Sequence, residues 1–443
     1  MTTTRNQEPT TRTTPRSTTR TTTRSTNRAP NPSTPHHPRF RPLRRIARAL
    51  LTFLGILLTP ITALAATWAT ATLTPTPWLF TAAGVTAAAA TCALLVYAGT
   101  RHRTATALIT TATLALTTLG AALTVLKPLD ETPPTPHEQP TGYWELDTGS
   151  RLAYTRVPAQ GTPRPTPVIV LHGGPGTPGD GPDAMDRILA GRGYDVYAYD
   201  QLGAGRSTRL KDPTGYTVAR QVADLEAVRK KIGAEKVVLM GASWGATLAA
   251  EYLAEHPGHV ERMVLTSPGV LWAPAWKDRD EGDIWDRLTP ELQARIDELE
   301  ANPRLMAWSL LMAADPRAAH AVVGDAEIDP VFAKLLTIAA PAATCHPERP
   351  LKDLPGSLPG FYANQLTTAD QLTVPDPRPA LRRTTVPVLV VRGDCDYKNP
   401  GIAREYDEVL PGATLLTVED AGHLVDMEKP HEYRQAVTEF VTD

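Results

Sequence analysis

Cysteine is scarce in this chain, which has three cysteines among 443 residues. Cys92, Cys345 and Cys395 lack the spacing of a metal-ligand motif, and they are too few for a disulfide framework. Cys92 lies in an apolar stretch, where cysteine behaves as a small hydrophobic residue. Cys345 and Cys395 can pair only if they lie outside the cell, and the sequence does not show whether they are close. Zinc-finger and small disulfide-stapled classes are therefore excluded.

Charge is missing from one long stretch, because residues 49–100 contain no Asp, Glu, Lys or Arg. The formal net charge of −2 conceals a strong partition: residues 1–48 carry +10 and residues 127–443 carry −14. The basic part is a Thr/Arg/Pro-rich tail with almost nothing to bury, and we expect it to be disordered over residues 1–45. It has no interleaved aromatic residues, so the sequence does not predict nucleic-acid binding.

Three apolar segments at residues 49–72, 78–99 and 104–126 are about as long as a helix that crosses a hydrocarbon core of about 30 Å. A Thr-Pro-Thr-Pro turn at residues 74–77 divides the first two segments. We therefore expect a membrane anchor of about three transmembrane helices over residues 46–126, in contact with membrane lipid.

The positive residues predict the orientation of this anchor. The Arg-rich tail and the pair Arg101 and Arg103 stand at the ends that would face the cytoplasm, since cytoplasmic loops are rich in Lys and Arg. Three crossings place everything after Lys127 on the outer face of the cell membrane, as a multi-pass protein with an extracytoplasmic domain. The alternative is a signal peptide, with Arg residues at 44–45 and a cleavage site at 63–65, which leaves two apolar segments unexplained.

After a Pro-rich linker at residues 127–142 the pattern changes to apolar strand runs that alternate with amphipathic helices. This alternation predicts an α/β fold with a mostly parallel sheet and helices on both faces. Residues 271–383 show helical stretches such as 290–300 and 304–314 but no clear strands, so they predict a helical cap inserted into a core at 143–270 and 384–443. The expected strands are 144–146, 152–154, 167–171, 195–199, 236–240, 262–266, 386–391 and 414–418, and the expected core helices are 183–191, 217–232, 244–255 and 431–441.

The sequence G-A-S-W-G at residues 241–245 follows the apolar run 237–240 and precedes the helix-prone stretch 246–250. In this position a G-x-S-x-G motif predicts a nucleophile elbow, in which a sharp turn holds the hydroxyl of Ser243 above the sheet. The alternative is an ordinary glycine-rich turn from strand to helix.

Two further candidates follow strands that come later in the chain. Asp396 and His423 complete the order Ser, Asp, His of an α/β-hydrolase triad, in which the imidazole takes the proton of Ser243 and the carboxylate orients the imidazole. Asp394 competes with Asp396 as the acid. His172, which precedes a glycine-rich loop, is expected to brace that loop by hydrogen bonding rather than to act as a base.

An oxyanion intermediate needs preorganised donors. The backbone N–H groups of Trp244 and Gly174 are the candidates, whereas Pro175 has no N–H to donate.

Together these motifs resemble the proline iminopeptidase group of serine peptidases. The matching pieces are residues 172–176, 200–207 and 241–245, and the resemblance covers about residues 143–443. It implies an α/β-hydrolase core, a helical cap, and release of an N-terminal residue, often proline, with no metal and no cofactor.

Two departures from the family pattern bear on the substrate. Leu202 stands where the family usually has Arg, and Leu311 and Met312, after Trp308, stand where the cap motif W-x-x-W-E has its second Trp and its Glu. In the family this Glu binds the free ammonium group of the substrate. The acids that could replace it are Asp315, Glu281, Asp283 and Asp286.

We therefore expect a membrane-anchored serine hydrolase that releases N-terminal residues from short peptides through an acyl-enzyme. The alternative is an esterase acting on small esters, which needs no ammonium anchor. A catalytically inactive binding module would require a broken triad, and all three candidates are present.

Overall fold

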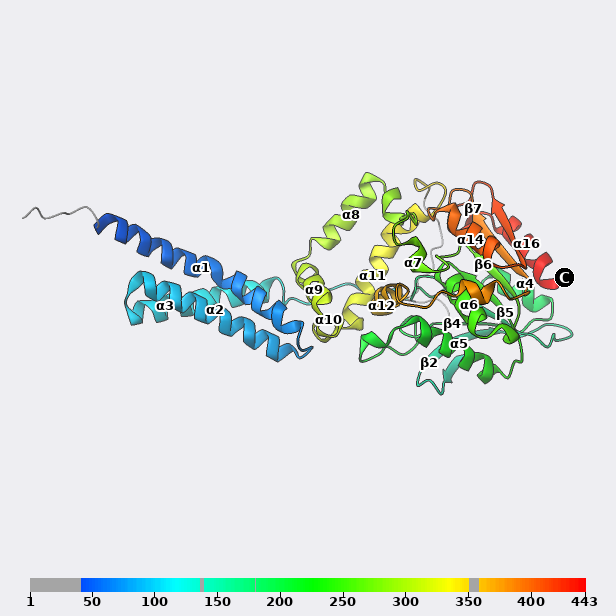
Figure 1. Ribbon diagram of the computed structural model, residues 1–443, viewed down its shortest axis with the longest axis horizontal. Helices are drawn as coiled ribbons and strands as arrows, with labels where there is room; N and C mark the ends of the chain where they lie inside the picture. The colour runs from blue at the N-terminus through cyan, green and yellow to red at the C-terminus, as the bar shows by residue number, and fades with distance from the viewer. Residues whose placement is uncertain (1–40, 136–138, 180, 350–357) are drawn as a thin grey trace, which may run out of the picture.

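The computed structural model describes residues 41–135, 139–179, 181–349 and 358–443. Figure 1 shows an elongated molecule, with three long N-terminal helices extending from a rounded α/β domain that contains the C-terminus. The expected disordered tail lies, up to residue 40, outside the described residues, and so do residues 136–138 of the expected linker. The expectation of disorder was wrong for residues 41–45, which form the start of a helix.

The N-terminal part consists of helix α1 (Arg41–Ala71), α2 (Pro77–Thr100) and α3 (Arg103–Leu123), each long and apolar enough to span a membrane. Pro60 lies inside α1, as tolerated in such helices. Helices α1 and α2 form an antiparallel hairpin, and the buried face of α2 combines the small residues Ala88 and Cys92 with Phe80 and Val96.

The α/β domain is built on one eight-stranded sheet of order β1-β2-β4-β3-β5-β6-β7-β8. β1 and β2 are antiparallel to their neighbours, and all later strands are parallel. The carboxyl ends of β3, β5, β6, β7 and β8 therefore meet at one edge, where the candidate residues follow. The strands are β1 (Gly142–Glu145), β2 (Arg151–Val157), β3 (Val168–Leu171), β4 (Val196–Tyr199), β5 (Val237–Ala242), β6 (Val260–Thr266), β7 (Val388–Gly393) and β8 (Ala413–Val418).

Helices cover both faces of the sheet, as the nearly continuous apolar strands require. Because side chains alternate along a strand, Val238 and Leu239 of β5 belong to opposite faces and to different core clusters. The Leu239 face packs against α5 (Val218–Ile232), α6 (Trp244–Glu255) and α14 (Pro400–Val409), and the Val238 face packs against α4 (Ala184–Gly191) and α16 (Pro430–Thr442).

Helix α14 is an element that the sequence reading missed. The Asn399 side chain caps its first turn and Pro400 occupies its first position, a combination that marks a helix start. Ile402, Tyr406 and Val409 then face the core at helical spacing. These two signals could have predicted the helix.

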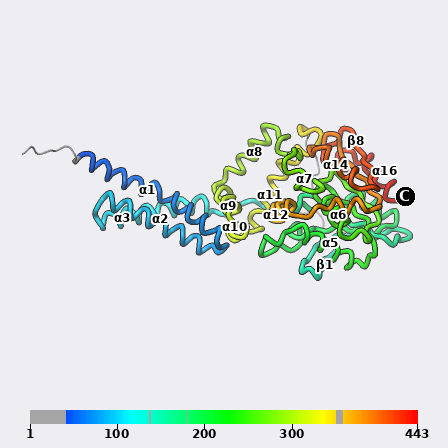
Figure 2. The backbone as a smooth tube through the Cα atoms, viewed as in Figure 1, coloured from blue at the N-terminus to red at the C-terminus, as the bar shows by residue number. Residues whose placement is uncertain are grey.

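Among the described residues, all the elements between β6 and β7 are helical, as the sequence predicted for this interval, and they form the cap. Figure 2 shows α9 and α10 at the end of the α1–α2 hairpin. Ala71 and Phe80 of the hairpin pack there against Ala318 of α10 and Leu311 of α9, so the cap contacts the N-terminal helices directly. The helices are α7 (Ala273–Trp276), η3 (Ile284–Arg287), α8 (Pro290–Glu300), α9 (Pro303–Ala314), α10 (Pro316–Val322), α11 (Asp325–Ala339), η4 (Ala340–Ala343), α12 (Phe361–Asp370) and α13 (Arg378–Leu381).

A buried ion pair joins the cap to the core. Arg209, in the loop after β4, donates from Nη2 to Asp329 Oδ2 of α11 at 2.9 Å, and the Asp329 side chain is 3% exposed. Arg209→Ala leaves this carboxylate buried without its partner, so we expect the free energy of unfolding to fall by about 3–5 kcal/mol. Urea unfolding of the detergent-solubilised chain measures this loss.

The matched control is Arg156→Ala, which breaks the more exposed pair with Asp195. It should cost less than about 1 kcal/mol. An equal loss of unfolding free energy in the two variants would contradict the conclusion that the Arg209–Asp329 ion pair contributes more stability than the Arg156–Asp195 pair.

Candidate active site

Ser243 lies in a sharp turn between β5 and α6. Its backbone has φ 53° and ψ −118°, a conformation that a residue with a side chain rarely adopts. Hydrogen bonds hold it there: its N–H donates to the Thr266 carbonyl at 2.9 Å, and its own carbonyl accepts from Gly269 at 3.0 Å. Gly245 lets the turn approach β3, since a Cβ at this position would overlap the Leu171 carbonyl. The turn has the geometry of a nucleophile elbow.

The glycine-rich loop after β3 lies against Ser243. A Cβ on Gly173 would come within 3.1 Å of the Ser243 Cβ. His172 braces the loop as predicted: its Nε2 accepts the N–H of Gln201 at 2.9 Å, so its Nδ1 carries the proton and donates to the Gly173 carbonyl at 2.9 Å. Burial lowers the pKa of His172 to about 4, which keeps the ring neutral.

Gln201 is a residue of the site that the sequence reading did not single out. Its Nε2 donates to the His172 carbonyl at 2.9 Å, and its Oε1 accepts from the indole nitrogen of Trp244 at 2.9 Å. One buried amide thus ties the glycine-rich loop to the residue after Ser243. Its position two residues after β4, at the carboxyl edge of the sheet, was the available signal.

One expected oxyanion donor, Trp244, directly follows Ser243, and the other, Gly174, follows Gly173, which lies against Ser243. Trp244 is the first residue of α6, and a helix leaves its first N–H groups without an intrahelical acceptor. In the part of the chain that the structure describes, the N–H groups of Trp244 and Gly174 have no hydrogen-bond acceptor. Both remain candidate donors toward a bound carbonyl oxygen.

The structure pairs His423 with Asp396. His423 Nδ1 lies 2.9 Å from Asp396 Oδ1, and the two side chains are 10% and 2% exposed. Asp396 also accepts the Lys398 N–H at 3.0 Å. Asp394, the competing acid, is exposed, and its carboxylate lies 3.4 Å from the Ala421 N–H.

The surroundings favour an ionised Asp396. Burial by itself raises the pKa of this carboxyl, but the charge of His423 and hydrogen bonds from His423 and the Lys398 amide outweigh it, so the pKa lies below its usual value. The ring of Tyr397 lies 4.6 Å from that of His423, with the two ring planes tilted by 37°. Tyr397 was also missed by the sequence reading, although it directly follows Asp396.

Ser243 and the His423–Asp396 pair stand at the same edge of the sheet. The register sets the ends of β5, β6, β7 and β8 side by side, with Ala242 opposite Thr266 and Gly393 opposite Val418. No hydrogen bond joins Ser243 Oγ to His423 among the described residues. Such bonds are often long in unliganded hydrolases and tighten when substrate binds.

The acidic residues that could replace the missing cap Glu differ in their partners and in their distance along the fold from the Asp396 loop. Asp315 caps α10 and pairs with Arg317 at 2.8 Å, so it serves the cap itself. The segment with Glu281 and Asp283 packs on the loop after Asp396: the Glu281 carbonyl accepts the Asn399 N–H at 2.9 Å. Asp283 and Asp286 are both exposed.

Trp308 of the expected substrate motif is a core residue of the cap. Its indole N–H donates to the Tyr362 hydroxyl at 3.0 Å, and its ring packs edge-on against Phe361. It is 7% exposed, so its side chain supports the cap instead of lining an open site.

Within the described part of the chain, two groups of side chains have the atoms to hold a metal ion. Cys345, Asp394 and Cys395 form one, and Cys345, His346 and Asp420 form the other, each within 4.8 Å. Both include Cys345, whose sulfur is bonded to Cys395 in a disulfide. In this form the sulfur is not a thiolate, the state in which cysteine binds metal.

The comparisons with known proteins agree with this geometry. A family described as the alpha/beta hydrolase fold matches residues 166–430. The proline iminopeptidase of Heyndrickxia coagulans is 28% identical over 294 residues, which cover 66% of this chain and 96% of that protein. That of Lactobacillus delbrueckii subsp. lactis is 27% identical over 303 residues, covering 67% and 96%. The structure of an alpha/beta fold family hydrolase from Bacillus anthracis superimposes with a TM-score of 0.51 at 17% identity, over 68% of this chain and 98% of that one.

The parallel sheet, the turn at Ser243 and the matched family define a hydrolase: the chain belongs to the α/β-hydrolase fold family. Within it, the protein is a proline iminopeptidase-like α/β-hydrolase preceded by three long apolar helices.

Proposed function

We propose that the protein is a membrane-anchored serine aminopeptidase of the proline iminopeptidase type, with a Ser243–His423–Asp396 triad. The observation that carries the proposal is the 2.9 Å contact between His423 and Asp396 at the sheet edge where Ser243 occupies its strained turn. The names of the relatives support release of an N-terminal residue.

In this mechanism Ser243 Oγ attacks the carbonyl carbon of the first residue of a short peptide while His423 Nε2 takes the hydroxyl proton. Asp396 holds His423 Nδ1–H, which fixes the tautomer and stabilises the imidazolium. The Trp244 and Gly174 amides stabilise the oxyanion. His423 then protonates the leaving amine, and water releases the acyl group from Ser243 by the same steps in reverse.

The free ammonium group of a peptide substrate needs a negative partner. Asp283 is our candidate, because its segment packs on the loop after Asp396 and its charge acts on Tyr397, whose ring lies 4.6 Å from that of His423. The side chain is exposed and accepts one hydrogen bond, from the Trp285 N–H at 3.1 Å. A carboxylate has capacity for a further donor.

The second candidate function is an esterase on the same scaffold. Met312 stands at the position of the family's cap Glu, and Trp308 beside it is buried inside the cap. An ester presents no charge to bind, so it needs no replacement for that Glu. Hydrolysis of proline and alanine arylamides, measured beside short acyl nitrophenyl esters, separates the two functions. Activity on the esters alone would reject the peptidase proposal.

Asp283→Asn is expected to raise KM for proline arylamide by about 10- to 100-fold, since a hydrogen bond to a charged group contributes roughly 1.5–3 kcal/mol. The same variant should leave ester hydrolysis within about twofold, because an ester has no ammonium group. Steady-state kinetics with both substrates measure this difference.

Glu298→Gln, on the exposed face of α8, removes a similar charge far from the Asp396 loop and is the matched control. An unchanged KM in Asp283→Asn would assign the ammonium group to another residue.

The proposed membrane placement predicts the side on which the α/β domain lies. Arg101 and Arg103, between α2 and α3, stand at the same end of the helical bundle as the start of α1, and the α/β domain lies at the other end. A reporter enzyme that works only outside the cytoplasm should therefore be active when fused after Leu126 and inactive when fused after Arg101. The reverse pattern would overturn the proposed orientation.

A further inference from the structure

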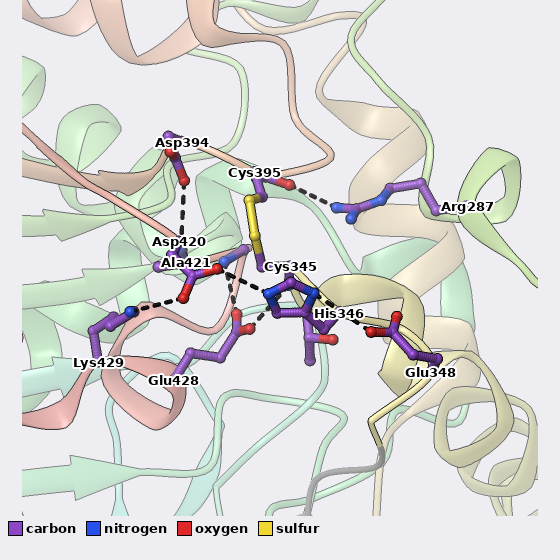
Figure 3. Close-up of a disulfide and its surroundings, with 12 residues drawn as sticks. Arg287, Cys345, His346, Glu348, Asp394, Cys395, Asp420, Ala421, Glu428 and Lys429 are labelled. Atoms are coloured by element: carbon purple, nitrogen blue, oxygen red, sulfur yellow. Dashed lines mark hydrogen bonds and ion pairs between the residues drawn. A yellow bond between two sulfur atoms is a disulfide. The ribbon is translucent and has the colours of Figure 1, made fainter.

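Residues 343–346, at the end of η4 in the cap, contact both of the loops that carry His423 and Asp396. Figure 3 shows the disulfide between Cys345 of this segment and Cys395, with the side chains around it. Cys395 directly precedes Asp396, and its Cα lies 5.1 Å from that of Cys345. The bridge therefore ties the cap to the acid loop one residue away from the proposed catalytic carboxylate.

The same segment holds the loop of His423. The His423 N–H donates to the Ala343 carbonyl at 2.7 Å. Glu428 makes a second tie, because one oxygen of its carboxylate accepts the Cys345 N–H at 2.9 Å and the other accepts the Gly422 N–H at 2.7 Å. Three hydrogen bonds thus fix the backbone of His423 and its neighbour relative to residues 343–346 of the cap.

The backbones of residues 343–346, of the Asp396 loop and of the His423 loop are in direct contact. A Cβ on Gly422 would lie 2.5 Å from the Ala343 carbonyl oxygen and 2.7 Å from the Cys345 nitrogen. The Cys395 N–H donates to the Ala421 carbonyl at 3.0 Å, which joins the acid loop to the histidine loop. On the other side, Arg287 of the cap donates to the Cys395 carbonyl at 2.6 Å. A displacement of residues 343–346 would therefore move both loops.

We propose that the Cys345–Cys395 disulfide and Glu428 position the Asp396–His423 pair, and that reduction of the disulfide slows catalysis. This inference rests on the triad proposed above. The three residues are positioning residues, since they act through the two loops and do not touch the reacting atoms. The bridge closes a segment with a sequence separation of 50 residues. Without the bridge, the hydrogen bonds of Ala343 and Cys345 described above remain to hold residues 343–346 against the two loops. Reactions that depend on such alignment lose about 100-fold for a displacement of about 1 Å.

Both cysteines are partly exposed, so a dithiol reductant can reach them. A thiolate of the reductant attacks one sulfur and forms a mixed disulfide, and its second thiol displaces the remaining cysteine. Two electrons and two protons pass to the protein, which gains two thiols, and the reductant is left as a cyclic disulfide.

The test compares the full chain in detergent with the double variant Cys345→Ser/Cys395→Ser. We expect kcat of the double variant to fall by about 10- to 100-fold, with KM within about twofold and an altered pH profile of kcat/KM. Dithiothreitol should lower wild-type kcat to the same level and leave the double variant unaffected. EDTA is present throughout, because a released Cys345 thiol would lie beside His346 and Asp420. Cys92→Ser, which changes the one cysteine outside the bridge, should behave as wild type.

Variants of Glu428 provide a second, independent test that does not require reduction of the disulfide. Glu428→Ala removes both acceptors and should lower kcat, whereas Glu428→Gln keeps one carbonyl acceptor and should restore part of it. This comparison decides the question if the double cysteine variant does not fold.

Two results would overturn the inference. One is a wild-type kcat and pH profile in both the double variant and Glu428→Ala, even if their melting temperatures fall, because the residues would then only stabilise the fold. The other is a loss of wild-type activity in dithiothreitol that also occurs in the double variant. Fluorophosphonate labelling of Ser243 in the wild type separates these failures from a failure of the triad itself: without labelling, both proposals fall.

Discussion

Ser243→Ala is expected to lower kcat by about 10⁴- to 10⁶-fold on arylamides and esters alike, the range over which loss of a serine nucleophile acts in such enzymes. Ser243 Oγ forms the covalent bond in the proposed mechanism, and methyl cannot replace it. The turn at φ 53° belongs to the backbone, so the variant should keep the fold. Steady-state kinetics and labelling by a fluorophosphonate, which reacts with the activated serine, measure the loss.

The matched control is Ser309→Ala on the exposed face of α9, where the hydroxyl donates only to the Met306 carbonyl of its own helix. It should retain wild-type activity and labelling. Persistent labelling of Ser243→Ala would mean that another residue is the nucleophile and that the turn at Ser243 is structural.

Asp396→Asn has the second largest expected effect, a loss of about 10⁴-fold in kcat near neutral pH, the size found for the equivalent change in a serine protease triad. An amide has the size of the carboxylate but donates where Asp396 accepts, so His423 is driven toward the wrong tautomer. It also cannot stabilise the imidazolium. Asp394→Asn, which alters the exposed neighbour, should stay within about threefold of wild type, and a large loss there would reverse the assignment of the acid.

The pKa of Asp396 also predicts how stability depends on pH. Because the folded state lowers this pKa below the value in the unfolded chain, the carboxylate contributes stability above the unfolded pKa, and this contribution is lost as pH falls through the folded pKa. The wild type should therefore lose more stability than Asp396→Asn when pH is lowered from about 5 to about 3, a range that spans the usual Asp value near 3.9. Parallel urea titrations at several pH values measure the difference, and parallel loss in both proteins would contradict it.

Most of the α/β domain could be predicted because its strands are short apolar runs with local boundaries. Each of the six expected parallel strands is present within two residues of its predicted start. Helix α14 was missed although its start signal, Asn399 and Pro400, is local and directly follows the loop of Asp396. The contact of the cap with Ala71 and Phe80 had no local signal at all, since it joins residues more than 200 positions apart.

The candidate residues at strand ends could be predicted from topology alone, because parallel strands bring their carboxyl ends to one edge. Which of these residues pair with one another could not be predicted from the sequence. Asp394 and Asp396 are two residues apart, and which of them reaches His423 depends on the path of the loop after β7. The acids of the cap were equally ambiguous, and only the packing of the Glu281 segment on the Asn399 loop separated it from Asp315.

By itself the sequence determined the elements: the apolar helices by their length and lack of charge, the sheet by its apolar runs, and the turn at Ser243 by its glycines between strand and helix. The tertiary structure alone decided which groups meet. It joined Cys345 to Cys395, His423 to Asp396 and Glu428 to two loops. The physical reason is that secondary structure follows from side-chain periodicity within a few residues, whereas these contacts depend on how loops from distant parts of the chain pack at one edge of the sheet.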